Sequence, residues 1–575
     1  MEVDETTSVI RNPVIAGFAP DPSIVRSGED YYLATSTMVW EPGVRLFHSR
    51  DLQRWELVGH ALAPGTHDLR GLASHEGVWA PDLSIDAATG TFYLAYSVMR
   101  STAARYFDVD NYVLTAPGID GPWSAPTYLN SVGFDPSLFH DADGRHWLVA
   151  LEWDPRDGYE HPGAIVLDEY DPERGALVGE SRRIYRGGSE RGCLEGPHLY
   201  RHGDRYYLMA AEGGTGYAHG VTLARSATIE GPYEPDPLNP FLTSNPASIS
   251  GRGDPDHLRL EWFNPHTQLQ KAGHGCLVST PEGEWYVAHL CARPIGPDHR
   301  STLGRETALQ QVRWSDDGWL RLTSGGTVAG LETPSPMGAA PHAESRDAVR
   351  RSDFRGPGLD AWFSTLRRPA SESWLAVAGD GPGLRLRGGE SVTSRHESSV
   401  VATTLQGFTA SVETRLDVAP SHFSQSAGLV VVYDERNLLY ARIYASESLG
   451  ARVVALLRVE SGVKAELLDT RTRLPEGPVL LGADLDVGVV RFWWAPADEP
   501  EDRTSLGPVL DTTFMSDESV DGFSGTMVGI ACVDGYRRDL VATFDHFELR
   551  HTELPHTEPR DTDPTIPAPP SRRNP

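Results

Sequence analysis

A repeating pattern of short apolar runs and polar turns fills the first 325 residues. One unit recurs five times, and it consists of a short apolar strand, a turn rich in Gly, Asp or Glu, and an aromatic-rich strand. This pattern is typical of β-hairpins, and helical periodicity is nearly absent from these windows. The five copies begin at Pro20, Ala80, Phe134, Glu195 and His274.

The copies start about 50 to 80 residues apart, with further β-like runs between them. Each unit therefore holds about four strands, which is the content of one propeller blade. The pattern predicts a five-bladed β-propeller over residues 9–325. Because the first strand of each blade lines the central axis, we expect the residues that open the repeats to converge on one central pocket.

The remainder of the chain predicts a second β domain. Residues 326–350 are rich in Gly, Pro, Ala and Ser, which is typical of a linker. Alternating strands over residues 351–550 predict a β-sandwich of jelly-roll-like type. Residues 551–575 are rich in proline and poor in apolar side chains, so we expect a disordered tail. The expected fold class is all-β, a propeller followed by a sandwich.

Composition and charge narrow the classes of partner. The 575 residues include 51 basic and 80 acidic side chains, so the formal net charge is −29. An acidic surface repels nucleic acids and anionic membranes, and we expect neither as a partner. The N-terminal segment MEVDETTSVIRNP lacks the apolar core of a secretory signal, and the four cysteines lie far apart. We therefore expect reduced thiols and a cytoplasmic location.

Polar side chains open the repeats. A single Asp before a proline is most simply a turn-capping residue. Several acids around one axis are different, because like charges at close range raise each other's pKa and are costly unless function requires them. The residues at these positions are Asp21, Asp82, Asp135, Glu195 and His274. We interpret Asp82 as a turn residue, because the segment WAPDLS offsets it from the other copies.

Paired carboxylates with an aromatic lining indicate glycoside hydrolysis. One acid protonates the leaving oxygen, and a second carboxylate deprotonates a water on the opposite face of the sugar. Inversion requires carboxyl groups about 6.5–9.5 Å apart, a spacing that different blades can provide across an axis. Trp79 and Phe134 lie just before the second and third repeat positions, where their rings would form an apolar surface for a sugar.

The propeller resembles glycoside hydrolase family 43, in particular its two-domain β-xylosidases. The matching stretches run in family order from about residue 12 to residue 322, and the segment GFSGTMVGIACVD resembles the appended sandwich of that subgroup. Several long motifs in order make a specific signal. The propeller motifs include NPVIAGFAPDPSI, GVWAPDLS, GFDPSLFHD, EGPHLY, AEGGTGYAHGVTLARS, KAGHGCLV and LGRETALQ.

The resemblance implies roles for the three acids. Asp21 matches the family's general base and Glu195 its general acid. Asp135 matches the third acid, which orients Glu195 and raises its pKa. An acid that must stay protonated near neutral pH can be held so by a neighbouring carboxylate. Arg305 in LGRET is the candidate cation beside Asp21 and the anchor for a sugar hydroxyl, and a structural salt bridge is its alternative role.

The resemblance also implies the substrate-binding walls. Trp79 and Phe134 match aromatic pocket walls, although packing within the blades would also place aromatic residues there. Phe523 matches a sandwich residue that closes the pocket, and its alternative is a core position. Met38 stands where the β-xylosidases usually carry an aromatic residue. That departure leaves open the preference between xylose and arabinofuranose.

No cofactor is implied as a requirement of the reaction. His274 in GHG matches the axial histidine beneath the pocket, where some relatives hold a hydrated calcium ion. A buried histidine without a metal is the equal alternative, so a structural calcium ion near the axis stays open. The implied partner is a small oligosaccharide, and because relatives form dimers or tetramers we expect a homo-oligomer.

The sequence as a whole predicts an inverting, exo-acting xylan 1,4-β-xylosidase that releases xylose from the non-reducing ends of xylo-oligosaccharides. An α-L-arabinofuranosidase, or an enzyme with both activities, is the first alternative. Two alternatives without catalysis are a carbohydrate-binding propeller and a structural scaffold. The intact set of Asp21, Asp135 and Glu195 argues against the binding propeller, because a binding module has no need of a protonated acid, whereas a scaffold would have a dispensable pocket.

Overall fold

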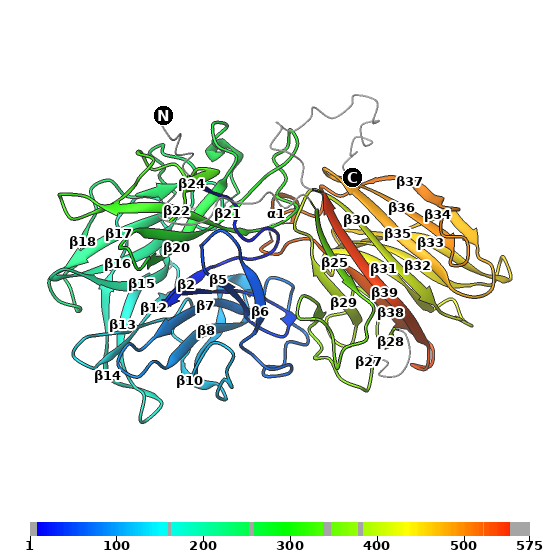
Figure 1. The fold of residues 1–575 in the computed structure, drawn as a ribbon, viewed down its shortest axis with the longest axis horizontal. Helices are drawn as coiled ribbons and strands as arrows, with labels where there is room; N and C mark the ends of the chain where they lie inside the picture. The colour runs from blue at the N-terminus through cyan, green and yellow to red at the C-terminus, as the bar shows by residue number, and fades with distance from the viewer. Residues whose placement is uncertain are drawn as a thin grey trace, which may run out of the picture.

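The computed structural model describes residues 8–158, 163–251, 258–336, 347–377, 383–520 and 522–552. Two β-rich domains lie side by side, with the propeller formed by the N-terminal half and the sandwich by the C-terminal part (Figure 1). Within these ranges no helix is long and apolar enough to cross a membrane. The helical elements described are η1 (Ala103–Arg105), η2 (Leu260–Trp262) and α1 (Asp517–Val520).

Five antiparallel sheets form the blades of the propeller, each of at least four strands in meander order. The first blade contains β2 (Ser23–Ser27), β3 (Asp30–Thr35), β5 (Arg45–Ser49) and β6 (Glu56–His60). The second contains β7 (Gly77–Ile85), β8 (Phe92–Ser101), β9 (Asp108–Ala116) and β10 (Thr127–Asn130). The third contains β11 (Ser137–His140), β12 (His146–Trp153), β13 (Gly163–Asp171) and β14 (Ala176–Tyr185).

The fourth blade contains β15 (Glu195–His202), β16 (Arg205–Glu212), β17 (Gly220–Ser226), β18 (Glu234–Pro235) and the short β19 (Leu242–Thr243). The fifth contains β20 (Gln270–Ser279), β21 (Trp285–Ala292), β22 (Glu306–Trp314) and β23 (Leu320–Leu322). The first strands of neighbouring blades contact one another around the axis. The predicted five-bladed propeller is therefore confirmed, and the repeats open on its innermost strands.

The N-terminal segment closes the ring against the last blade. The side chain of Asn12 is 2% exposed and both donates to the carbonyl of Leu309 and accepts from its amide, each at 2.8 Å. Strand β1 (Val9–Arg11) pairs with β24 (Glu332–Pro334), which follows the fifth blade. Hydrogen bonds between the two ends of the propeller hold the circular arrangement without a covalent link.

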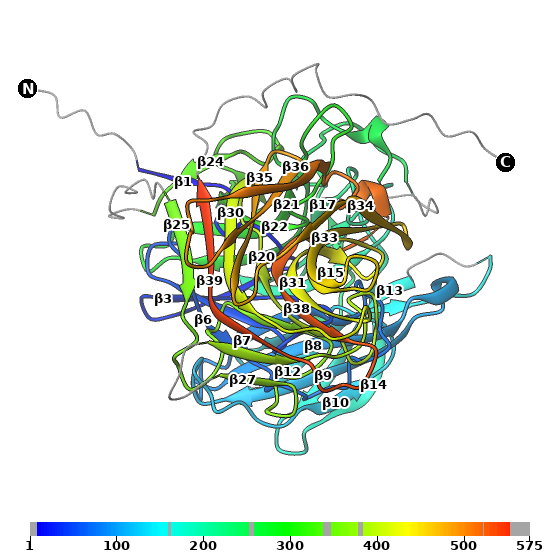
Figure 2. The same cartoon turned by 90° about the vertical axis from the view of Figure 1, so that its right-hand side faces the viewer.

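Two large antiparallel sheets form the sandwich, which Figure 2 shows in front of the propeller. One sheet contains β25 (Asp347–Ser352), β27 (Leu375–Val377), β28 (Leu384–Arg387), β39 (Val541–Thr552), β30 (Thr409–Asp417), β35 (Val479–Asp486), β36 (Val489–Pro496) and β37 (Thr504–Asp511). The other contains β34 (Val463–Arg473), β33 (Ala451–Glu460), β32 (Asn437–Ser446), β31 (Gln425–Asp434), β38 (Met527–Asp534), β29 (Ser399–Thr404), β26 (Ser364–Leu366) and β4 (Trp40–Glu41). The alternating burial of β30 and β39 places apolar side chains between the sheets.

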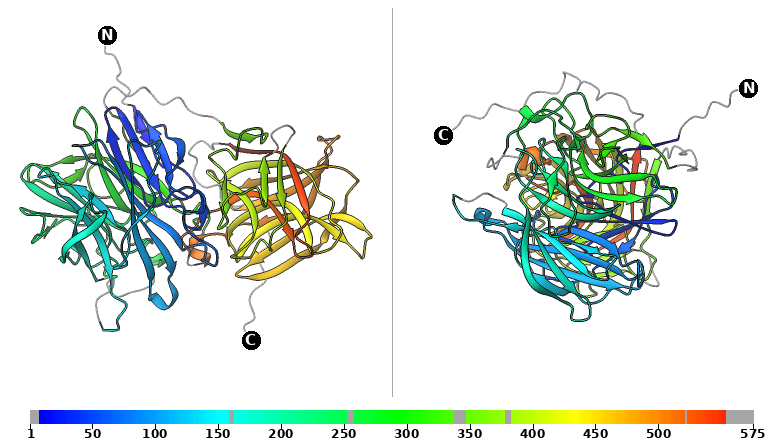
Figure 3. Two further views of the ribbon diagram at one scale, coloured as in Figure 1. Left: turned by 90° about the horizontal axis from the view of Figure 1, so that it is seen from below. Right: turned by 90° about the vertical axis from the view of Figure 1, so that its left-hand side faces the viewer.

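Main-chain strand pairing and a common apolar cluster join the two domains. Strand β4 belongs to the propeller sequence but pairs with β26 of the sandwich. Apolar residues of the propeller, including Val39 and Leu62, pack with Val430 and Tyr440 of the sandwich in one buried cluster. Figure 3 shows the domains abutting along this face. Because a large apolar contact and main-chain pairing both cross the boundary, the domains are held in one orientation.

Strands also occupy the segment for which the sequence predicts a linker, residues 326–350. It contains β24, which pairs with β1, and the start of β25, which pairs with β39 of the sandwich. Strand β39 extends to Thr552. The rest of the predicted tail, residues 553–575, lies outside the described residues.

Candidate active site

Each blade has a left-handed residue at an equivalent position, either just before its inner strand or within the first half of that strand. These residues have positive φ angles of 55°, 39°, 56°, 57° and 49°, and they are Asp21, Ala80, Asp135, Gly196 and His274. The next residue is proline in the first four blades and glycine in the fifth. A left-handed conformation costs a non-glycine residue roughly 1 kcal/mol or more, so the surrounding fold must impose it. The repeated motif thus encodes a sharp turn at the axis.

The three acids do not occupy the same position relative to the left-handed residue of their blades. Asp21 and Asp135 are themselves the left-handed residues, whereas Glu195 precedes the left-handed Gly196. Glu195 is therefore equivalent to Trp79 and Phe134, the residues before the turn in blades two and three. The fourth blade places a carboxyl group where its neighbours place an aromatic ring.

Asp82 lies two residues after the turn, in a layer below the site. Its carboxylate accepts hydrogen bonds from Ser23 Oγ at 3.2 Å and from the amide of Leu138 at 2.8 Å. Its Oδ1 atom is 3.3 Å from Nδ1 of His198. These partners come from three other blades, so Asp82 joins the inner strands and does not line the catalytic cavity.

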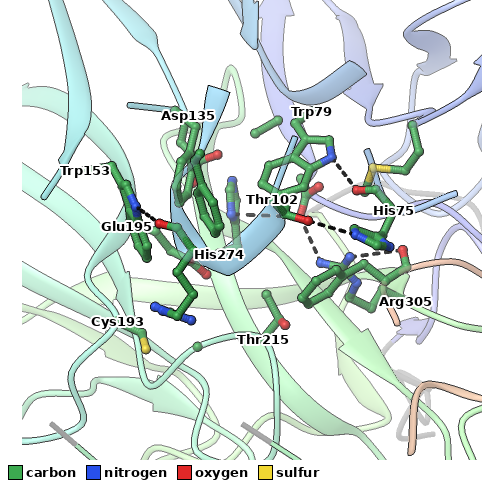
Figure 4. Close-up of a pocket in the computed structure, with 18 residues that line it drawn as sticks. His75, Trp79, Thr102, Asp135, Trp153, Cys193, Glu195, Thr215, His274 and Arg305 are labelled. Atoms are coloured by element: carbon green, nitrogen blue, oxygen red, sulfur yellow. Dashed lines mark hydrogen bonds and ion pairs between the residues drawn. The ribbon is translucent and has the colours of Figure 1, made fainter. Parts of the chain in front are cut away.

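A cavity of about 350 Å³ opens at the axis, and all nine residues predicted from the sequence line it (Figure 4). They come from all five blades and from the sandwich. They are Asp21, Met38, Trp79, Phe134, Asp135, Glu195, His274, Arg305 and Phe523. The convergence expected from the repeats is therefore found in the structure.

Asp21 sits among groups that stabilise a carboxylate. Its Oδ2 atom accepts a hydrogen bond of 2.7 Å from Ser36 Oγ. Its Oδ1 atom is 3.7 Å from Nη1 of Arg305 and 4.0 Å from Nδ1 of His274. A hydroxyl donor and a guanidinium both favour the charged form of an acid. This arrangement is suited to a group that accepts a proton from water.

Glu195 and Asp135 lie in surroundings that favour their protonated forms. Burial and the charge of Asp21 raise the pKa of Glu195 to about 8, although Arg305 opposes this shift. Burial and the carboxyl groups of Glu195 and Asp21 raise the pKa of Asp135 well above its usual value. The amide of Gly196 donates to Asp135 at 2.9 Å and fixes that carboxyl beside Glu195. The pair titrates as a unit and retains a proton near neutral pH.

Arg305 links the propeller to the residue that closes the cavity. Its Nη2 atom donates to the carbonyl of Phe523 at 3.0 Å, and its guanidinium carbon lies 4.9 Å from the centre of the Phe523 ring. Its Nε atom is buried and finds no hydrogen-bond partner among the described residues. A buried donor without a partner is costly, which suits a position where a substrate hydroxyl would accept a hydrogen bond.

Aromatic rings form one side of the cavity. The ring of Trp79 meets that of Phe134 edge-on at 5.7 Å and that of Phe523 at 6.4 Å. The indole Nε1 atom of Trp79 donates to the carbonyl of His75 at 2.8 Å, which fixes the ring in place. Met38 is 2% exposed, and its backbone exchanges hydrogen bonds with Val78 at the foot of this wall. Sugars bind well to such walls because their C–H faces are apolar.

His274 does not lie within a set of metal ligands. Among the residues that the structure describes, no group of three or more His, Cys, Asp or Glu side chains could hold a metal ion. The ring of His274 packs against the backbone of Gly196, where a Cβ atom would lie 3.0 Å from Nδ1. Burial lowers the pKa of His274 to about 4, so the ring is neutral. The described protein groups at this position offer no set of direct ligands for calcium, and a hydrated ion beside His274 stays a prediction.

Several lining residues were not predicted from the sequence. Most of them lie outside the repeated motifs, in loops, in η1 or at the end of β12, where no repeat signal marks them. Trp153 stacks on Phe107 with ring centres 4.3 Å apart, and the guanidinium of Arg105 lies over Trp153 at 4.9 Å. Gly214 and Thr215 fall within the quoted motif AEGGTGYAHG, which could have indicated them. The other unpredicted lining residues are His75, Ala80, Thr102 and Cys193.

A buried ion pair holds the sandwich turn that leads to Phe523. Helix α1 lies at the junction of the domains (Figure 1). Lys271 of β20 approaches Asp517 at 3.0 Å and Glu518 at 2.7 Å, and its side chain is fully buried. Burial works to lower the pKa of Lys271, but the two carboxylates outweigh it and the net pKa is raised. The second domain is thus anchored directly beside the cavity.

Comparison with known proteins agrees with this architecture. The model of the glycosyl hydrolases family 43 matches residues 10–320, and that of the beta xylosidase C-terminal concanavalin A-like domain matches residues 351–550. The crystal structure of xylan β-1,4-xylosidase from Bacillus halodurans C-125 superposes with a TM-score of 0.86 at 42% identity, covering 94% of this chain and 100% of that one.

Two curated relatives span nearly the whole chain. A xylosidase/arabinosidase 43B from Humicola insolens is 41% identical over 94% of this chain and 97% of its own length. A xylan 1,3-β-xylosidase from a Vibrio species is 38% identical over 94% of this chain and 99% of its own length. Together with the two family matches, these likenesses show that the chain belongs to glycosyl hydrolase family 43 and carries the concanavalin A-like second domain of its β-xylosidases.

Proposed function

We propose that this protein is an inverting, exo-acting β-1,4-xylosidase that releases xylose from the non-reducing ends of xylo-oligosaccharides. The observation that carries the proposal is the single cavity in which Asp21, Asp135 and Glu195 converge beside Arg305 under Phe523. The xylan β-1,4-xylosidase of Bacillus halodurans supports the same substrate class, since it shares both domains. A small oligosaccharide is accordingly the proposed partner.

The reaction follows from the contrasting surroundings of two acids. Asp21, beside Ser36 and Arg305, is the general base that removes a proton from the attacking water. Glu195, whose pKa is raised to about 8, is the general acid that protonates the departing glycosidic oxygen. The new bond joins water oxygen to the anomeric carbon, while the bond to the leaving oxygen breaks. Because the attack is direct, no covalent intermediate forms and the anomer inverts.

Asp135 acts on Glu195 rather than on the substrate. It accepts the amide hydrogen of Gly196, and its buried carboxyl faces the same charges as Glu195. With two carboxyl groups this close, ionising both Asp135 and Glu195 is costly. One proton therefore stays on the pair and is available for transfer. Asp135 is therefore proposed as a positioning residue for the general acid.

The shape of the cavity favours cleavage at chain ends. Phe523 of the sandwich and Trp79 of the propeller close one side of the cavity, which disfavours a long polymer lying across it. The stacked rings of Phe107 and Trp153 line the same cavity and offer an apolar surface to the leaving sugar. One bound sugar unit and one leaving unit suit an enzyme that acts on short oligosaccharides.

A second activity on α-L-arabinofuranosides is favoured by one residue and one relative. Met38 lines the cavity where the xylosidase pattern usually has an aromatic residue, and a flexible thioether adapts to differently shaped ligands. The relative from Humicola insolens is named for both activities. Initial rates on nitrophenyl β-xyloside and nitrophenyl α-L-arabinofuranoside measure the balance between them.

Homo-oligomeric assembly and a cytoplasmic location stay predictions. Light scattering of the purified protein would establish its oligomeric state.

Hydrolysis of xylobiose tests the proposal directly. We expect the wild-type protein to release xylose, and to cleave 1,4-linked xylobiose faster than the 1,3-linked isomer. The comparison of linkages is needed because one relative is a xylan 1,3-β-xylosidase. Binding of xylobiose without turnover would favour a carbohydrate-binding propeller, and faster cleavage of the 1,3-linked isomer would overturn the assigned linkage.

A further inference from the structure

A buried histidine lies behind Glu195. His219 ends the loop between β16 and β17, and its side chain is fully buried. Its Nε2 atom is 3.9 Å from Oε1 of Glu195. His219 is not among the residues that line the cavity, although Thr215 of the same loop is (Figure 4). The ring therefore approaches Glu195 from the protein interior and not from the substrate side.

The other nitrogen of the ring fixes its proton. Nδ1 of His219 is 3.0 Å from the carbonyl oxygen of Lys271. A carbonyl oxygen only accepts hydrogen bonds, so Nδ1 carries the hydrogen. When the ring is neutral, an Nδ1 atom that carries the hydrogen leaves the lone pair on Nε2. The atom that faces Glu195 is thus an acceptor.

The packing prevents the ring from turning away. A Cβ atom at Gly273 would lie 2.3 Å from the His219 ring, so only glycine leaves room for it there. The carbonyl of His219 accepts a hydrogen bond of 2.7 Å from Thr243 Oγ1. These two contacts hold the ring face and the backbone of His219 in place.

We propose that His219 is a positioning residue that keeps Glu195 protonated and oriented for transfer of its proton to the leaving oxygen. This inference rests on the proposed function of Glu195 as the general acid. A fixed lone pair repels a carboxylate but favours a protonated carboxyl group, which is able to donate to it. At 3.9 Å the effect is electrostatic and not a hydrogen bond, so the proton of the carboxyl group stays available to the leaving oxygen.

Other charged groups also act on Glu195. Asp21 and Asp135 disfavour its ionisation, whereas Arg305 favours it. The neutral ring of His274 lies across Gly196 from the acid. Loss of His219 would therefore weaken the acid without abolishing it, because Asp21 and Asp135 remain.

Leaving-group dependence separates this role from a structural one. A dinitrophenolate departs without protonation, whereas the sugar leaving group of xylobiose requires an acid. Asparagine places its amide near Nδ1 of the original ring, and glutamine places its amide near Nε2. We expect His219→Asn to lower kcat on xylobiose by about 30-fold or more but on dinitrophenyl β-xyloside by less than about 3-fold. His219→Gln should restore part of the xylobiose rate.

His289 offers a matched control. It is also fully buried, its Nδ1 atom is 2.8 Å from the carbonyl of Leu290, and it does not line the cavity. His289→Asn should lower the two rates equally, if it lowers them at all. The proposal would be overturned if His219→Asn reduced both substrates alike or neither, or if His289→Asn produced the same split. Failure of the wild-type protein on both substrates would instead count against the proposed function.

Discussion

Lys271 and Asp517 form a buried ion pair of 3.0 Å between the propeller and the sandwich. The pair is supported by Glu518, 2.7 Å from the same ammonium group, and by Tyr433, which donates to Asp517. Helix α1, which contains both acids, precedes Phe523 by a few residues. The contact therefore fixes the turn that delivers a sandwich residue to the propeller cavity.

We expect Lys271→Met to destabilise the protein strongly. Removing one partner leaves two buried carboxylates without a counter-charge, which typically costs about 3–5 kcal/mol. Lys464 is the matched control, because it is the only other lysine and its ion pair with Glu466 is exposed. Chemical denaturation should show a loss of about 0–1 kcal/mol for Lys464→Met. Equal losses for the two variants would contradict this account of the domain interface.

The activity should fall as the pH rises through about 8, the value to which burial and Asp21 raise the pKa of Glu195. Above that pH the acid has lost the proton that it must deliver. The pH dependence of kcat on xylobiose measures this alkaline limb of the profile. Dinitrophenyl β-xyloside needs no proton on its leaving group, so its kcat should not fall through the same pH; an identical fall on that substrate would show that another group controls the limb.

Glu195 should also make the protein less stable at high pH. Because its pKa is raised on folding, stability is fully present below the unfolded pKa and is lost as the pH rises through the folded pKa of about 8. The slope is at most about 1.4 kcal/mol per pH unit. Glu195→Gln should therefore be inactive on xylobiose yet more stable than the wild type at pH 8. Thermal unfolding of both proteins at pH 5 and pH 8 tests the difference.

Phe523→Ala should weaken binding more than it slows the chemical step. The ring closes the cavity and its centre lies 4.9 Å from the guanidinium carbon of Arg305, but a phenyl ring has no group that could transfer a proton. We expect KM for xylobiose to rise about 10-fold, since an aromatic contact contributes about 0.5–1.5 kcal/mol. An unchanged KM would place the substrate away from the sandwich.

Asp82→Asn should affect stability and leave catalysis nearly intact. The amide would retain the shape of the side chain but would lose part of the acceptor set that serves Ser23, Leu138 and His198. A buried hydrogen bond left unmade costs about 1–3 kcal/mol. Denaturation should report this loss, while kcat stays within a few-fold of the wild type. A large fall in kcat would assign Asp82 to the chemistry.

The sequence predicted the blades well because each repeat carries its own turn. The Asp-Pro pairs at Asp21 and Asp135 mark the left-handed residue, and the same turn recurs as Gly196-Pro197. The one-residue offset of Glu195 was harder to see, because a sequence repeat does not reveal which residue of the motif faces the axis. Convergence of these residues then followed from the closed ring of blades.

Contacts between segments that are far apart in the chain could not be predicted from the sequence. Lys271 and Asp517 are 246 residues apart, and no local pattern marks an ion pair across two domains. Strand β4 pairs with β26 at the edge of a sandwich sheet, and no local pattern around Trp40 indicates this pairing. Trp153 ends β12 and Arg105 ends η1, and both reach the cavity from positions that the repeated strand pattern does not mark.

The anomer of the first xylose released from xylobiose tests the central claim most directly. Proton NMR during the first minutes of hydrolysis distinguishes the α and β forms before they equilibrate. We expect early α-xylose from the wild-type protein and loss of that signal in Asp21→Ala and Glu195→Ala. Early β-xylose would mean retention through a covalent intermediate, and it would contradict the assignment of Asp21 as the base that activates water.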